Sequence, residues 1–371
     1  MKPKLLYLIA EDWYFCSHRM PLAIAAKAAG FEVTVATRLR KHSEMIRSAG
    51  LQAISFELSR SGMNPIMESN AVMRLAALYH RVRPDIVHHV AMKPVLYGSL
   101  AAKMSGVRQV VNAIAGLGWL FASRSPIARL LKPHVRFALH LFLKQSRIIV
   151  QNPDDARLVA GLGVDPCRLR MIRGSGVDIE RFTPAPEQPG PPVVVLPSRL
   201  LWDKGVREFV DAARKLRELD INARFALVGA PDPGNPAAVP DGTLLAWQKE
   251  GVVELWGHRE DMPAVFHQSH VVCLPSYREG LPKALLEAAA CARPIVTTDE
   301  PGCREIVRHM ENGLLVPSRN SQVLAKAIGL LLANADLRRR MGEKGRHLVE
   351  SEFFVEKVIT DTLTLYQEML S

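Results

Sequence analysis

The stretch Leu274–Glu287 reads LPSYREGLPKALLE and contains the end of one secondary-structure element and the start of the next. The apolar run that ends at Leu274 predicts a buried strand, and Gly280 lies in the loop that follows it. We expect a helix to begin around Pro282, because proline has no N–H to leave unpaired at the first helical position. A strand, a loop and a helix in this order predict one unit of a parallel α/β sheet.

The same alternation continues on both sides of this stretch. In the second half of the chain, short apolar runs predict strands over residues 193–197, 224–228, 252–256, 270–274, 294–298 and 313–316. The first half predicts strands over residues 4–10, 31–37, 51–57, 85–90, 109–113 and 147–151, and a helix over 21–29. The chain of 371 residues is therefore expected to form two α/β domains in tandem.

A proline-rich segment separates the two series of strands. Residues 183–192 contain five prolines, a composition that suits neither a helix nor a central strand. We therefore expect an N-terminal domain over residues 1–186 and a C-terminal domain over 187–350. Residues 351–371 are expected to form a helix that returns to the N-terminal domain.

The charge of the chain is unevenly distributed. Residues 1–190 contain 26 Lys and Arg against 13 Asp and Glu, a net charge of +13, whereas the remainder has 22 against 24, a net charge of −2. No zinc-finger spacing, basic zipper or aromatic RNA-binding signature accompanies the basic half, so we expect no nucleic-acid partner. An anionic membrane surface or a phosphorylated lipid is the expected partner of this half.

The cysteines and the apolar segments indicate the compartment. The five cysteines form no CxxC pair and no metal-ligand cluster, which is typical of a reducing cytoplasm. No apolar run is long enough to cross a bilayer, so we expect peripheral association with the inner face of the cytoplasmic membrane. Residues 120–150 carry six basic and no acidic side chains among Leu and Phe, a pattern that fits either a membrane-binding helix or a helix that covers the sheet.

The loop and helix of the opening stretch carry two carboxylates. Glu279 lies in the loop and Glu287 about a turn and a half into the expected helix. The N–H groups at the start of that helix, with the positive end of its dipole, form a site suited to a diphosphate. Carboxylates accept hydrogen bonds from vicinal hydroxyls, so we expect a sugar at one and a ribose at the other.

Two cations are expected beside this site. Arg199 follows the strand 193–197, and Lys204 precedes the next helix, so both should lie at the carboxyl edge of the second sheet. Two cations beside a helix N-terminus neutralise a departing diphosphate without a metal ion.

The segments Ser198–Gly205, Gly257–Pro263, Pro275–Glu287 and Gly302–Glu305 resemble those of retaining glycosyltransferases of family 4. The resemblance covers nearly the whole chain and implies the GT-B fold, an α/β architecture of two Rossmann-like domains that face each other across a cleft. It implies a UDP-sugar donor, retention of anomeric configuration, a front-face displacement and no required metal. The roles that it implies for residues of the second domain are diphosphate binding by Arg199 and Lys204, sugar binding by Glu279, ribose binding by Glu287, base binding by Gly257 and Arg259, and donor contacts by Gly280, Leu281 and Pro282.

The N-terminal half resembles bacterial transferases that add an N-acetylhexosamine or a related sugar to a glycan on undecaprenyl diphosphate. The matching segments are Ser17–Pro21, Ala91–Lys93, Gly98–Lys103 and Gly116–Gly118, whereas the first loop, residues 11–19, lacks the paired glycines of the wider family. Histidines at strand ends can hydrogen-bond sugar hydroxyls, and lysine can bind a phosphate. The expected acceptor contacts are His18, His88, Lys93, Gly116 and Gly118, with His89 in a catalytic role.

These patterns together predict a hexosyltransferase that moves a sugar from a UDP-sugar to a polyprenyl-diphosphate-linked glycan in bacterial surface polysaccharide or glycoprotein assembly. Two alternatives stay open: a GT-B-fold UDP-sugar epimerase and a nonenzymatic protein that binds anionic lipid. An epimerase would turn over a UDP-sugar without an acceptor, and a binding protein would release no UDP.

Overall fold

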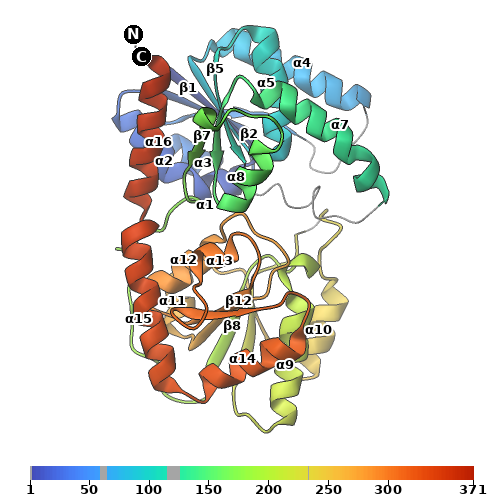
Figure 1. Ribbon diagram of the computed structural model, residues 1–371, viewed down its shortest axis with the longest axis vertical. Coiled ribbons are helices and arrows are strands. Elements are labelled where there is room, and N and C mark those ends of the chain that lie inside the picture. Colours follow the sequence, from blue (N-terminus) through green and yellow to red (C-terminus); the bar gives the residue numbers. More distant parts are fainter. Residues whose placement is uncertain (1, 59–64, 115–125, 233) are drawn as a thin grey trace. The chain divides into compact units, whose positions relative to one another are not determined.

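The computed structural model describes residues 2–58, 65–114, 126–232 and 234–371, which form two compact units. Unit 1 comprises Met1–Ser175 and Glu356–Ser371, and unit 2 comprises Gly176–Val355 (Figure 1). Each unit is a parallel sheet covered by helices, as the alternation of strand and helix patterns predicts.

Unit 1 contains a seven-stranded parallel sheet in the order β3-β2-β1-β4-β5-β6-β7. Its strands are β1 (Lys4–Glu11), β2 (Glu32–Arg38), β3 (Gln52–Ser55), β4 (Ile86–Val90), β5 (Gln109–Ile114), β6 (Arg147–Val150) and β7 (Leu169–Met171). Its helices are α1 (Asp12–His18), α2 (Met20–Ala28), α3 (Ser43–Ser48), α4 (Pro65–Val82), α5 (Met92–Ser105), α7 (Pro126–Leu143), α8 (Pro153–Ala160), the 3-10 turn η1 (Pro166–Arg168) and α16 (Val355–Leu370).

Unit 2 contains a six-stranded parallel sheet in the order β10-β9-β8-β11-β12-β13. Its strands are β8 (Val193–Pro197), β9 (Arg224–Val228), β10 (Glu254–Gly257), β11 (Val271–Leu274), β12 (Ile295–Thr298) and β13 (Gly313–Val316). Its helices are the 3-10 turn η2 (Trp202–Lys204), α9 (Val206–Glu218), α10 (Asp241–Lys249), α11 (Met262–His267), α12 (Lys283–Ala290), α13 (Cys303–Ile306), α14 (Ser321–Leu332) and α15 (Ala335–Glu352).

The central strands are continuous apolar runs because helices cover both faces of each sheet. All five residues of β8, VVVLP, are buried, and so are all five of β4, IVHHV. Such runs are typical of parallel sheets with two covered faces. In each sheet the strand order reverses beside the first strand, between β1 and β4 and between β8 and β11. Ligands of open α/β sheets bind beyond the carboxyl ends of the strands at this reversal.

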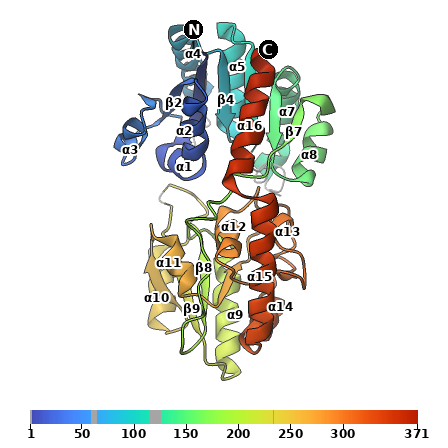
Figure 2. The ribbon, with the colours of Figure 1, turned by 90° about the vertical axis from the view of Figure 1, so that its left-hand side faces the viewer.

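The last helix, α16, packs against unit 1. Its residues Leu365 and Tyr366 are fully buried in the cluster that also contains Tyr7 and Leu22, on the face of the sheet covered by α2 (Figure 2). Tyr366 donates or accepts hydrogen bonds with Tyr7 (3.0 Å between hydroxyl oxygens) and with Nδ1 of His88 (2.5 Å). The chain therefore leaves unit 1 once and comes back to it.

The boundary between the units lies at Gly176, not at residue 187, where the proline-rich segment had placed it. The amide of Val177 donates to the carbonyl of Phe353 (3.0 Å), and the amide of Val355 donates to the carbonyl of Val177 (3.0 Å). The guanidinium of Arg346 on α15 donates to the carbonyls of Ile179 and Phe182. Residues 176–186 consequently pack with the second unit although they precede most of the prolines.

The segment 11–19 was predicted to be a loop, but most of it is helical. β1 extends to Glu11, and α1 begins directly at Asp12. The carboxylate of Asp12 accepts hydrogen bonds from the amides of Arg40 (2.6 Å) and His42 (3.1 Å), which tie the start of α1 to the segment after β2. These long-range bonds hold a helix where the local sequence contains no cap.

Candidate functional site

The donor loop, residues 275–281, connects β11 to α12 and is fixed to its neighbours by hydrogen bonds. The hydroxyl of Ser276 and the amide of Tyr277 both donate to the carbonyl of Asp203 (3.2 and 2.9 Å). The hydroxyl of Thr298, at the end of β12, donates to the carbonyl of Ser276. The loop is thus held at the carboxyl edge of the unit 2 sheet, where β8 and β11 meet.

Lys204 and Glu279, both predicted site residues, lie in contact at this edge. The Nζ atom of Lys204 is 2.5 Å from Oε1 of Glu279, and the two side chains are 17% and 13% exposed. A partly buried ammonium beside a carboxylate combines a donor for phosphate oxygens with an acceptor for sugar hydroxyls. The structure therefore brings together Lys204, which is predicted to bind the diphosphate, and Glu279, which is predicted to bind the sugar.

Two glycines permit the backbone segments of this site to approach one another. Gly205, directly after Lys204, has φ +72°, and a Cβ atom there would clash with the carbonyl oxygen of Pro275. Gly302 has φ +82°, and a Cβ atom there would clash with the carbonyl oxygen of Gly280. Only glycine combines this backbone conformation with so little space, so both residues position the donor loop.

Arg199 also lies at the end of β8, but its described partner is a residue that the sequence analysis missed. Its Nη1 atom is 2.6 Å from Oδ2 of Asp232, in the loop after β9, and the Arg199 side chain is 42% exposed. Asp232 lies in a loop of turn residues, PDPGNP, and no sequence signal connects it to Arg199.

Glu287 lies in the middle of α12 and is 8% exposed. Burial raises the pKa of its carboxyl group, an effect that the nearby Lys283 ammonium opposes; Nζ of Lys283 lies 3.2 Å from Oε1 of Glu287. Leu281 and Pro282 complete the approach to α12, and Pro282 is its N-cap residue. Helix α12 begins at Lys283, one residue after the predicted start.

The predicted base-binding residues lie at the end of β10. Gly257 has φ +68°, and no heavy atom lies within 4 Å of the position of a Cβ atom there. Its carbonyl accepts a hydrogen bond from the amide of Gly229 (2.8 Å), which links the ends of β10 and β9. Arg259 is exposed just beyond it. This part of the edge is open enough for a flat ring to approach the backbone.

The predicted role of His89 in catalysis is corrected by the structure. His89 is fully buried, with Nδ1 2.8 Å from Oδ1 of Asn112 and Nε2 3.0 Å from the hydroxyl of Tyr79. Burial lowers the pKa of His89 to about 4, so the ring is neutral near pH 7. Both ring nitrogens are used within unit 1, and His89 is a packing residue.

His88, a predicted acceptor contact, is also buried. It is 1% exposed, its Nδ1 atom contacts the Tyr366 hydroxyl, and burial together with the Arg19 charge lowers its pKa. Adjacent residues of a strand point to opposite faces, and helices cover both faces of this sheet. A pair of histidines at a strand end therefore does not reach the surface here.

The other acceptor residues have three different outcomes. His18 ends α1, and its ring stacks on Tyr14 with the centroids 4.2 Å apart. Lys93 lies in the first turn of α5, with Nζ 2.7 Å from Oε1 of Glu68, so a phosphate would have to compete with that carboxylate. Gly116 and Gly118 lie outside the described residues.

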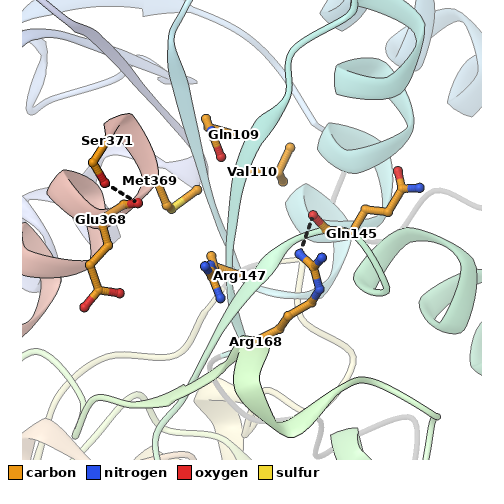
Figure 3. Close-up of a pocket in the computed structure, with 8 residues that line it drawn as sticks. All are labelled: Gln109, Val110, Gln145, Arg147, Arg168, Glu368, Met369 and Ser371. Atoms are coloured by element: carbon orange, nitrogen blue, oxygen red, sulfur yellow. Dashed lines mark hydrogen bonds between the residues drawn. The ribbon is translucent and has the colours of Figure 1, made fainter.

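A cavity of about 240 Å³ lies in unit 1 at the amino ends of β5 and β6 (Figure 3). Arg168 at its rim donates to the carbonyl of Gln145 (3.3 Å), and the cavity contains no predicted site residue. It is lined by Gln109, Val110, Gln145, Arg147, Arg168, Glu368, Met369 and Ser371. The strands begin at this edge, so the cavity is separate from the acceptor residues, which follow the strand ends.

Comparisons with known proteins match both units to one kind of enzyme. Residues 4–152 match the family model described as "Glycosyl transferase 4-like", and residues 178–348 match "Glycosyl transferases group 1". Together the two models match most of the chain. The chain is a glycosyltransferase with a 4-like domain followed by a group 1 domain.

Two curated relatives cover most of this glycosyltransferase. N,N'-diacetylbacillosaminyl-diphospho-undecaprenol alpha-1,3-N-acetylgalactosaminyltransferase of Campylobacter jejuni is 29% identical over 343 residues, 88% of each chain. UDP-Gal:alpha-D-GlcNAc-diphosphoundecaprenol alpha-1,3-galactosyltransferase of Escherichia coli is 25% identical over 318 residues, 82% of this chain and 81% of the relative.

Solved structures share the fold. Sucrose-phosphate synthase from Thermosynechococcus elongatus matches with a TM-score of 0.83 and 19% identity, over 100% of this glycosyltransferase and 99% of that chain. An Anabaena protein in complex with UDP and glucose matches with a TM-score of 0.81 and 18% identity, over 98% and 99% of the two chains. The fold is GT-B, as the sequence resemblance implied.

Within the described ranges, no helix is long and apolar enough to span a membrane.

Proposed function

We propose that this glycosyltransferase transfers an N-acetylhexosamine or a related sugar from a UDP-sugar to a glycan on a polyprenyl diphosphate. The product would belong to a bacterial surface polysaccharide or glycoprotein glycan. The contact between Lys204 and Glu279 at the reversal of the unit 2 sheet carries the donor half of this proposal. The names of the two curated relatives, both of which act on undecaprenol-linked diphosphates, support the acceptor half.

Each donor residue then has a defined task. The ammonium of Lys204 and the guanidinium of Arg199 bind the diphosphate oxygens, and the first turn of α12 adds backbone N–H groups. Glu279 accepts hydrogen bonds from sugar hydroxyls, and Glu287 accepts them from the ribose. Charge that develops on the leaving UDP is stabilised by cations already in place, so transfer proceeds without a metal ion.

We further propose that the anomeric configuration is retained by front-face displacement. The acceptor hydroxyl oxygen attacks the anomeric carbon on the face from which UDP departs, and the bond to the β-phosphate oxygen breaks. The hydroxyl proton passes to an oxygen of the departing diphosphate. Support for this route comes from Glu279, whose pairing with Lys204 suits a sugar-binding residue better than a free nucleophile.

Helix α7 is the proposed contact with the anionic inner face of the cytoplasmic membrane. Leu139 and Leu143 are fully buried in unit 1, whereas Phe137 and Leu141 are 65% and 52% exposed. Arg136 is exposed beside them. One face of α7 thus packs on unit 1, while the opposite face presents apolar and basic side chains together, a composition that suits a lipid interface. One helix can therefore both cover the sheet and bind a membrane, the two alternatives that the sequence left open for this segment.

The test uses the full chain with vesicles that contain undecaprenyl-diphosphate-linked saccharides and a panel of UDP-sugars. We expect release of UDP and a lipid-linked product that is heavier by one sugar residue, detected by mass spectrometry. NMR of the product would give the anomeric configuration. Conversion of a UDP-sugar without an acceptor would indicate an epimerase instead, and no UDP release with any donor or acceptor would overturn the proposal.

A further inference from the structure

A tyrosine inside the donor loop is held by a buried carboxylate of the neighbouring helix. The hydroxyl of Tyr277 donates to Oε1 of Glu208 at 2.7 Å, and Glu208, in the first turn of α9, is 9% exposed. Oε2 of Glu208 is buried and has no hydrogen-bond partner among the described residues. A carboxylate buried with half of its acceptor capacity unused lowers stability, so its presence here indicates a role other than stabilising the fold.

A cation holds the same ring from another side. The guanidinium carbon of Arg319, in the connection between β13 and α14, lies 4.1 Å from the centroid of the Tyr277 ring. A guanidinium over an aromatic face is attracted by the electrons of the ring. The Tyr277 side chain thus joins three segments at the carboxyl edge of the unit 2 sheet.

The position of Tyr277 in the chain connects it to both charged donor residues. Glu279 follows it by two residues, and the Tyr277 amide is bonded to the carbonyl of Asp203, the neighbour of Lys204. Glu208 follows Lys204 by four residues, across the turn at Gly205. A shift of the Tyr277 ring would therefore move Glu279 relative to Lys204. The Oε1 atom of Glu279 and the Nζ atom of Lys204 are 2.5 Å apart.

We infer that Tyr277, held by Glu208 and Arg319, is the positioning residue that sets Glu279 against the sugar of the donor. It acts through Glu279 and contacts neither the diphosphate nor the base. This inference rests on the proposed function, because it requires that Glu279 binds the donor sugar. Recognition of the sugar then depends on the hydrogen bond from Tyr277 to Glu208, whereas the binding of UDP does not.

The test measures binding of UDP, UDP-N-acetylgalactosamine and UDP-N-acetylglucosamine by calorimetry to wild type, Tyr277→Phe and Glu208→Gln. In wild type the favoured UDP-sugar should bind better than UDP. Tyr277→Phe should reduce that advantage about tenfold while UDP affinity stays unchanged, since one hydrogen bond is lost behind Glu279. The melting temperature should fall as well, because the buried Glu208 carboxylate loses its partner. Glu208→Gln, which keeps an oxygen acceptor for the Tyr277 hydroxyl, should retain most of the wild-type advantage.

Two results would overturn the inference. One is an unchanged preference for the UDP-sugar in Tyr277→Phe. The other is an equal loss of UDP and UDP-sugar affinity, because the bond would then serve only the fold. A wild type that binds none of the three nucleotides would instead refute the proposed function, which distinguishes the two failures.

Discussion

The two units have the same architecture but use their polar residues differently at the carboxyl edges of their sheets. In unit 2, Lys204, Glu279 and Arg199 lie in loops, pair with opposite charges and stay partly exposed. In unit 1, His88 and His89 lie inside the sheet and bond to Tyr366, Tyr79 and Asn112. A charged side chain in a loop after a strand is available to a ligand, whereas a titratable one within a covered strand serves the core.

The largest effect is expected from the charged pair of unit 2. Glu279→Gln and Lys204→Ala should each lower turnover by a factor of about 100 or more, because contacts to the donor and to the leaving group are lost. UDP release in the presence of lipid-linked acceptor measures this. Lys249→Ala, an exposed residue at the end of α10, is the control and should behave as wild type. Near-normal turnover in both site variants would show that the charged loop residues of unit 2 do not bind the donor.

The next effect concerns the basic residues of α7. Reversing Arg129, Lys132 and Arg136 to Glu should release the protein from anionic vesicles, since each basic residue near such a surface contributes on the order of 1 kcal/mol. Sedimentation with phosphatidylserine-containing vesicles measures binding, and UDP affinity should persist because the donor residues lie in unit 2. Sedimentation of the variant at the wild-type level, or its absence in wild type, would leave α7 as a helix that only covers the sheet.

A smaller effect is expected from the buried histidines, and it depends on pH. His89 has a pKa of about 4 in the folded protein and an ordinary value near 6.5 when unfolded. Below pH 6.5 the unfolded chain therefore binds a proton that the folded chain does not, and stability is lost as the pH falls toward 4. Between pH 7 and pH 5 this amounts to about 2 kcal/mol.

Unfolding by urea at both pH values tests this expectation. His89→Gln should show a smaller loss of unfolding free energy on acidification than wild type, by about the amount that His89 contributes. Its turnover at pH 7, relative to the amount of folded protein, should stay near that of wild type. A folded variant without activity would support the catalytic role predicted for His89, and an unchanged pH dependence would contradict the lowered pKa.

The smallest effect is expected from metal removal. Turnover should be the same with excess chelator, because Arg199 and Lys204 supply the positive charge that a metal would otherwise provide. The assay compares UDP release before and after EDTA, with magnesium added back. A complete loss that magnesium reverses would show that these two cations are insufficient.

Local patterns predicted most of the fold and part of the site. The strands β8, β9 and β13 have the predicted bounds, because continuous apolar runs between turn residues leave few alternatives. The short edge strand β7 and helix α1 were missed, since α1 depends on bonds from Asp12 to Arg40 and His42. Asp232 and Glu208 were missed for the same reason: their partners are distant in the sequence, and only the folded chain brings them together.

The return of the chain to unit 1 has a consequence for synthesis on the ribosome. Every strand of unit 2 and its last helix precede α16 in the sequence, so unit 2 is complete while unit 1 still lacks Leu365 and Tyr366. The hydroxyl of Tyr7 and the ring nitrogen Nδ1 of His88 then lack their hydrogen-bond partner, the hydroxyl of Tyr366. Although domains commonly fold in the order in which they are made, here the domain made first is finished last. A nascent chain stalled before residue 355 would expose the apolar face of unit 1 that α16 covers.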